Sequence, residues 1–136
     1  IKDILHAKYA LQIATGYMDI VRKLPSVVHV NTQQSGKITV VGDLHGQLRD
    51  LIHIFRHNGM PSFDNPYLFN GDLVDRGDYS VEIVLLLFGF AVADPGSVYI
   101  NRGNHEDMTV CTGYDLGVPL CRGAFTPSTR LVSISP

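Results

Sequence analysis

The stretch KITVVGDLHGQ, residues 37–47, joins a short β-branched run to a polar turn that begins with glycine. β-Branched residues bounded by glycines are typical of buried strands, so the run Ile38–Val41 predicts a strand. The same pattern returns in YLFNGDLVDRG, residues 67–77, and in VYINRGNHE, residues 98–106. The chain is therefore expected to contain three short strands, each followed by a polar turn.

Helical patterns separate these strands. The spacing of apolar residues predicts helices over residues 5–24, 48–58 and 81–93. Pro25 ends the first of them, and Ser80 is placed as the N-cap of the third. Strands that alternate with helices predict an α/β fold, in which right-handed crossovers feed a largely parallel sheet and the site lies at the carboxyl ends of the strands.

Composition limits the classes of function. The chain has 136 residues, with 11 Lys and Arg against 13 Asp and Glu and a formal net charge of -2, which is ordinary for one compact domain. A charge this small gives no support to nucleic acid or an anionic membrane surface as a partner. The longest apolar run, Ile83–Ala93, is shorter than the roughly 20 residues of a membrane-spanning helix, so no membrane span is expected. We expect a cytoplasmic location, with the nucleus as the alternative.

The C-terminal segment loses the regular pattern. From Cys111 onward, Gly, Pro, Ser and Thr follow without sustained periodicity, which predicts a loosely ordered tail over residues 111–136. Its cysteines, Cys111 and Cys121, are expected to be free thiols, because two cysteines in a chain without a secretory signal are more often free than bridged. No Cys/His spacing typical of a zinc site accompanies them.

Acidic and imidazole side chains follow each predicted strand, at one expected edge of the sheet. A single aspartate at a strand end is usually a turn or capping residue, but three such clusters argue for a common site. Asp43 and His45 are two positions apart in an extended segment, so their side chains leave on the same side. With Asp72 they predict one metal site, and Asp72 can bridge to a second ion that Asn104 also binds. Oxygen and imidazole ligands suit Mn, Fe or Zn.

Other residues of these turns predict acid–base chemistry on a phosphate group. His105 is a candidate general acid, and Asp75 is the natural carboxylate to orient its ring. Arg76 carries a planar donor fork that matches phosphate oxygens, and Gly77 beside it permits close approach of an anion. We assign Asn104 to phosphate binding as well.

Several side chains have two interpretations. Arg76 could instead form an ion pair with Asp75 or Asp78. Glu106 and Asp107 could support the neighbouring ligands or be exposed loop acids. The four remaining histidines are expected to be solvated or partly packed: His6, His29, His53 and His57.

Three blocks of sequence in this order resemble those of a known family. GDLHGQ at 42–47, GDLVDRG at 71–77 and RGNHE at 102–106 resemble the signature blocks of the metal-dependent phosphoprotein phosphatases, the serine/threonine group that includes calcineurin. The segments IFRHNGMP at 54–61 and NPYLFN at 65–70 look most like the branch called protein phosphatase with EF-hands, or retinal degeneration C.

The resemblance covers about residues 5–110. It implies the sheet and crossover helices of the calcineurin-like metallophosphoesterase fold, of which this chain is the N-terminal half. Residues 1–110 would be an incomplete phosphatase catalytic domain, and residues 111–136 a divergent tail. The implied partner is a phosphoprotein substrate, and regulation by calmodulin or calcium is implied only for a longer parent protein.

The resemblance also implies a reaction, the hydrolysis of phosphoserine and phosphothreonine. A hydroxide held by two metal ions attacks phosphorus, and Arg76 and the metals take up charge on the phosphate oxygens. His105, with Asp75 as its partner, protonates the departing oxygen. Position by position, Asp43, His45 and Asp72 match ligands of the first metal; Asp72 and Asn104 match ligands of the second.

The chain also departs from the family pattern. In the family the second metal takes two further histidines, and no histidine follows His105 here. We therefore expect a fragment, weak binding of the second metal and an exposed apolar sheet face. Two alternatives remain: a dinuclear phosphoesterase for other substrates, which Arg76 disfavours, and a catalytically incomplete half domain that acts only as a binding module.

Overall fold

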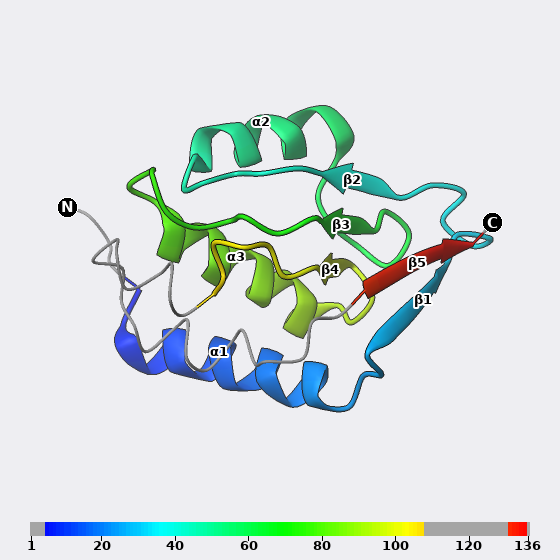
Figure 1. The fold of residues 1–136 in the computed structure, drawn as a ribbon, viewed down its shortest axis with the longest axis horizontal. Coiled ribbons are helices and arrows are strands. Elements are labelled where there is room, and N and C mark those ends of the chain that lie inside the picture. Colours follow the sequence, from blue (N-terminus) through cyan, green and yellow to red (C-terminus); the bar gives the residue numbers. More distant parts are fainter. Residues whose placement is uncertain (1–4, 108–130, 136) are drawn as a thin grey trace.

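The computed structural model describes residues 5–107 and 131–135. Its helices and strands alternate along most of the chain (Figure 1), in the following order. They are α1 (Ala7–Arg22), β1 (Val27–Asn31), β2 (Thr39–Val41), α2 (Leu48–Asn58), β3 (Tyr67–Phe69), α3 (Ser80–Ala93), β4 (Val98–Ile100) and β5 (Leu131–Ser135). The three predicted helices and three predicted strands are present, which confirms the α/β fold.

A three-stranded parallel sheet carries the strands that the motifs follow. Its order is β2-β3-β4, and Val41, Phe69 and Ile100 lie side by side at the carboxyl ends. All three residues of β3 are buried, as expected for the central strand of a parallel sheet. Because the strands are parallel and in this register, the three polar loops leave from the same edge.

The helices pack as a layer around α3. This helix is apolar on nearly all sides, and Ile83, Leu87 and Phe88 are fully buried. The ring of Tyr17 from α1 stacks on Phe88 with centroids 3.8 Å apart, and Phe55 from α2 meets α3 edge-to-face. Two right-handed crossovers between neighbouring strands place α2 and α3 on the same side of the sheet, which explains this layer.

A second sheet pairs β1 with β5 in parallel, and neither strand was predicted. β5 lies inside the segment 111–136, so the prediction of a loosely ordered tail is wrong for residues 131–135. Those five residues form a strand because β1, far away in sequence, supplies the backbone partners. The run Val27–Val30 did carry a signal for β1, because three of its four residues are valine.

The start of α3 also differs from the prediction. Tyr79, not Ser80, is the N-cap, and its side chain makes no capping hydrogen bond. Ser80 is the first residue of the helix, and its buried hydroxyl donates to the Gly77 carbonyl at 3.3 Å. This contact ties the helix to the polar loop that precedes it.

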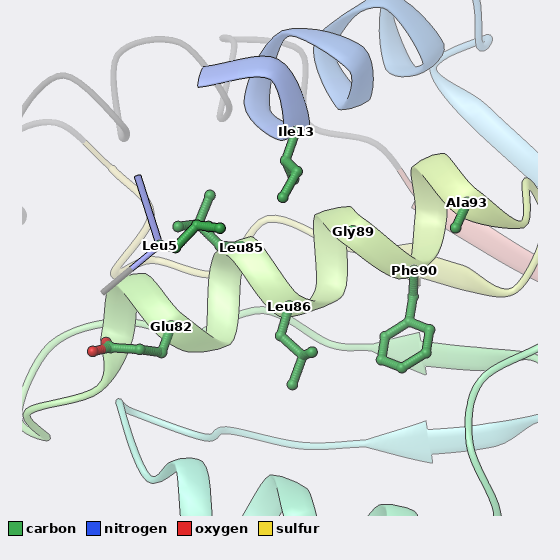
Figure 2. A pocket seen from close by; sticks show the side chains of 8 residues that line it. All are labelled: Leu5, Ile13, Glu82, Leu85, Leu86, Gly89, Phe90 and Ala93. Carbon is green, nitrogen blue, oxygen red and sulfur yellow. The ribbon is translucent and has the colours of Figure 1, made fainter. Parts of the chain in front are cut away.

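Apolar surface is exposed on both the helices and the sheet. On the sheet Val40 is 58% exposed, but its neighbour Leu68 is 5% exposed, so the expected apolar sheet face is wrong for the central strand. A groove of about 460 Å³ runs along α3. Figure 2 shows Leu5 and Ile13 on one side of it, above the side chains of α3.

No helix in the described part of the chain combines the length and the hydropathy needed to cross a membrane. The predictions for Cys111 and Cys121 lie outside the described residues.

Candidate active site

The loops after β2, β3 and β4 meet at the carboxyl edge of the three-stranded sheet. Backbone hydrogen bonds join the first loop to the second: the N–H groups of Leu44 and His45 donate to the Asp72 carbonyl at 3.0 and 2.9 Å. The N–H of Gly77 donates in turn to the His45 carbonyl at 2.9 Å. These bonds fix the first two loops relative to each other before any ligand is considered.

Two glycines make this contact between the loops sterically possible. A Cβ atom at Gly46 would lie within 3.0 Å of the Gly77 backbone, and one at Gly77 within 3.0 Å of the backbone of His45 and Gly46. The sequence assigned Gly77 to close approach of an anion. The structure shows that its missing side chain is required by the neighbouring loop.

Glu106 joins the third loop to the second. Its carboxylate, in a side chain only 1% exposed, accepts from the N–H groups of Asp72 at 2.8 Å, Leu73 at 2.7 Å and Gly103 at 2.8 Å. Of the two interpretations of Glu106, the supporting role is therefore correct. No local signal separates them, because two of its three partners lie on another loop.

The site holds an unusual concentration of left-handed backbone. The four non-glycine residues with positive φ in the described part of the chain are His45 (42°), Asp72 (50°), Asp75 (67°) and Arg76 (67°). Such conformations cost about 1–3 kcal/mol each and persist only where surrounding contacts enforce them. All four were candidate site residues from sequence, so the strain coincides with the candidate chemistry.

Three candidate metal ligands converge in the structure. One oxygen of Asp43, one ring nitrogen of His45 and one oxygen of Asp72 lie within 4.8 Å of one another. His45 Nδ1 lies 2.9 Å from the Val74 carbonyl, which can only accept, so Nδ1 carries the proton. Nε2, 3.7 Å from Asp43 Oδ2, is then the nitrogen with a lone pair. A fixed tautomer and two carboxylates fit a transition-metal ion.

The third loop orients the Asp72 carboxylate. The backbone N–H of His105 donates to Asp72 Oδ1 at 2.9 Å, so Asp72 is held from both ends, through its backbone by Glu106 and through its side chain by His105. Asn104, one residue earlier, is exposed in the same loop. Its assignment as a metal ligand and phosphate contact stays a prediction.

His105 and Asp75 form a buried pair beside the metal ligands. His105 Nδ1 lies 2.8 Å from Asp75 Oδ2, with His105 8% and Asp75 0% exposed. The rings of His105 and His45 meet edge-to-face with centroids 4.8 Å apart. The structure thus brings together the predicted general acid and its orienting carboxylate, next to the three candidate metal ligands.

Arg76 is exposed in the loop after β3, directly after the buried Asp75. Within the described residues it forms no ion pair with Asp75 or Asp78, so that alternative has no support there. Asp107 accepts from Arg102 Nη2 at 2.6 Å, at the surface of the third loop.

The other histidines lie away from the cluster. His6 is the N-cap of α1, where its ring accepts from the Lys8 N–H at 3.1 Å. His29 is exposed on β1, and His53 and His57 are exposed on α2.

Comparisons with known proteins agree with this geometry. Residues 36–129 match the family model of the calcineurin-like phosphoesterases. The match extends beyond residue 110, where the resemblance in sequence was expected to end.

Among curated relatives, serine/threonine-protein phosphatase 5 of Arabidopsis thaliana is 52% identical over 106 residues, which are 78% of this chain and 20% of the relative. The mouse serine/threonine-protein phosphatase with EF-hands 1 is 44% identical over 113 residues, 83% of this chain and 17% of the relative. Both branches therefore match, and the identity is higher to the first. The chain spans about a fifth of the length of these relatives.

A solved phosphatase structure has the same fold as this chain. A protein serine/threonine phosphatase from Saccharomyces cerevisiae superposes with a TM-score of 0.79 at 34% identity. The alignment covers 90% of this chain and 39% of the yeast chain.

Proposed function

Because the chain belongs to the calcineurin-like phosphoesterase family, we propose that it forms part of a metal-dependent phosphatase that hydrolyses phosphoserine and phosphothreonine in proteins. The observation that carries the proposal is the contact between two groups at one sheet edge. The metal-ligand triplet Asp43, His45 and Asp72 lies against the His105–Asp75 pair, through the ring contact of the two histidines. The relatives named as serine/threonine-protein phosphatases support the choice of substrate.

We assign Asp43, His45 and Asp72 to one metal ion and Asp72 with Asn104 to a second, with Mn, Fe or Zn as the metals. When bound, such ions act as Lewis acids that polarise a phosphoryl oxygen and make a water molecule more acidic. The chain holds the ligands in place for this chemistry: the Val74 carbonyl fixes the His45 tautomer, and the His105 N–H fixes the Asp72 carboxylate.

His105 then acts as the proton donor. Asp75 holds its Nδ1, so the opposite ring nitrogen, Nε2, delivers a proton to the departing seryl or threonyl oxygen. Arg76 places its guanidinium against the phosphate oxygens, where negative charge increases in the transition state. The contact between His105 and Asp75 and the family membership support these roles.

The test is manganese-supported hydrolysis of a phosphoseryl peptide by the 136-residue chain. We expect turnover that Asp72→Asn abolishes and that His29→Gln, a change of an exposed histidine on β1, leaves intact. Bis(p-nitrophenyl) phosphate is assayed in parallel. Faster hydrolysis of this diester than of the peptide would favour a phosphoesterase for other substrates.

A second assay is needed because the chain spans only about a fifth of its relatives. Residues 36–107 replace the corresponding segment of the Saccharomyces cerevisiae phosphatase, with and without Asp72→Asn. Activity of the hybrid that the substitution removes would support the proposal even if the chain alone is inactive. Inactivity of both the chain and the hybrid, with metal binding retained, would favour a half domain that acts as a binding module.

Regulation is a separate proposal. One of the matched relatives is named for its EF-hands, which are calcium-binding helix–loop–helix units. We propose calcium or calmodulin control only for a protein that extends beyond these 136 residues.

A further inference from the structure

Two histidines lie one turn apart on the outer face of α2. The ring centroids of His53 and His57 are 4.5 Å apart, with an angle of 33° between the ring planes. Side chains at positions i and i+4 of a helix are neighbours, which accounts for the contact. Both residues are exposed, whereas Leu51 and Phe55 of the same helix are buried in the core. The pair therefore faces solvent.

We propose that His53 and His57 form a further metal site outside the candidate active site, which chelates one Cu²⁺, Ni²⁺ or Zn²⁺ ion through one ring nitrogen from each residue. The imidazole of histidine is a common protein ligand of these ions, and two imidazoles one helical turn apart can bind the same ion. Among the described residues neither ring has a hydrogen bond or an ion pair with a side chain. Small rotations about the side-chain bonds are then the main cost of aligning the two nitrogens.

The charges around the pair nearly balance. His57 lies in the last turn of α2, where the helix dipole favours a cation, and Asp50 lies three residues before His53 on the same face. Arg49 and Arg56 on the same helix oppose a cation. Because the chain supplies only two ligands and the surrounding charges nearly cancel, we expect a metal site of modest affinity. Water molecules would fill the remaining coordination positions of the ion.

This site is separate from the candidate active site in place and in chemistry. α2 rises about 1.5 Å per residue, so His57 lies about 14 Å along the helix from Leu48, which follows the first polar loop. α2 forms the outer edge of the molecule beside β2 (Figure 1). The active-site triplet contains two carboxylates, which suit Mn²⁺, whereas the α2 pair contains none and should bind Mn²⁺ poorly.

The difference in ligands defines the experiment. Ni²⁺ is titrated calorimetrically at pH 7.5 into the 136-residue chain in the presence of excess Mn²⁺, which occupies the carboxylate-rich site. Variants are His53→Gln and His57→Gln, with His29→Gln as the matched control on β1 and Asp72→Asn as the control for the other site. We expect the unmodified chain and both controls to take up one equivalent of Ni²⁺, and each α2 variant to lose it.

Electron paramagnetic resonance of one added equivalent of Cu²⁺ provides the second readout. The expected spectrum shows two nitrogen ligands in the unmodified chain and in Asp72→Asn, and fewer in His57→Gln. Circular dichroism verifies that the two α2 variants retain their helical signal. Full Ni²⁺ uptake by either α2 variant, or its loss in Asp72→Asn, would overturn the proposal.

Discussion

Asp75 and His105 show how much of the site depends on single side chains. Asp75 is completely buried, and one of its carboxylate oxygens, Oδ1, has no hydrogen-bond partner among the described residues. A buried carboxylate is costly unless it is paired, and its other oxygen is paired with the His105 ring. The pairing supplies the orienting carboxylate that the proposed acid–base role of His105 requires.

Replacing His105 tests that role. We expect His105→Gln to lower kcat toward a phosphoseryl peptide by roughly 10²–10⁴-fold, because the alkoxide leaving group then departs without a proton. Hydrolysis of p-nitrophenyl phosphate should fall much less, since p-nitrophenolate is a stable leaving group. Parallel assays of the two substrates check this, and an equal loss on both would argue against proton donation.

Glu106 is a residue whose role is structural support of the ligands. Glu106→Gln replaces one acceptor oxygen by an amide that donates, so at least one of the three N–H groups loses its partner. We expect the free energy of unfolding to fall by about 1–3 kcal/mol. Urea denaturation measures the change. Glu82→Gln, at an exposed position of α3, is the matched control and should change stability little.

At the scale of elements, the loops that follow the strands contribute more to the candidate site than the strands do. Each strand of the main sheet has three residues, yet its loop carries several polar side chains. The first two loops touch through Gly46 and Gly77, and hydrogen bonds between them hold His45 and Asp72 in left-handed conformations. Loop contacts therefore determine where the ligands lie.

Gly77→Ala tests this contact. Its Cβ would meet the backbone of the first loop, which cannot rotate away, so we expect a loss of about 1–3 kcal/mol in stability together with weaker Mn²⁺ binding. The matched control is Gly42→Ala, where nothing lies within 4 Å of the added atom. Thermal unfolding and Mn²⁺ titration of both variants measure the difference. Equal behaviour of the two would contradict the packing argument.

At the scale of the molecule, the site exists only because three loops meet. Asp43 and His45 come from the loop after β2, Asp72 and Asp75 from the loop after β3, and His105 from the loop after β4. Two carboxylates close together repel each other unless a cation lies between them. The folded chain should therefore gain stability when a metal binds.

We expect Mn²⁺ to raise the melting temperature and a chelator to reverse the rise. A ligand that binds only the folded state stabilises it by about 2.7 kcal/mol at a free concentration 100 times its Kd. Differential scanning calorimetry with and without Mn²⁺ measures this. Asp43→Asn should remove most of the shift, because it removes one of the three converging ligands.

A calorimetric titration with Mn²⁺ tests the expected weak binding of a second metal by Asp72 and Asn104. The described residues offer one group of three acidic or imidazole ligands, so one tight Mn²⁺ site is expected. Two tight Mn²⁺ sites would contradict this expectation.

The sequence by itself determined the α/β class and the three parallel strands with their helices, and it predicted the five side chains that the structure brings together: Asp43, His45, Asp72, Asp75 and His105. These features follow from local causes: apolar periodicity sets each element, and strands joined by right-handed crossovers place their polar turns at one edge. The short motifs also carried the resemblance to the phosphatase family, which the comparisons confirm.

The tertiary structure decided the features that depend on partners far away in sequence. β1 and β5 form because they pair with each other. The Glu106 carboxylate can be buried because it accepts hydrogen bonds from backbone N–H groups of another loop. The open groove along α3 depends in the same way on which elements cover that helix. A local pattern contains no information about such contacts, since backbone pairing and burial are properties of the assembled chain.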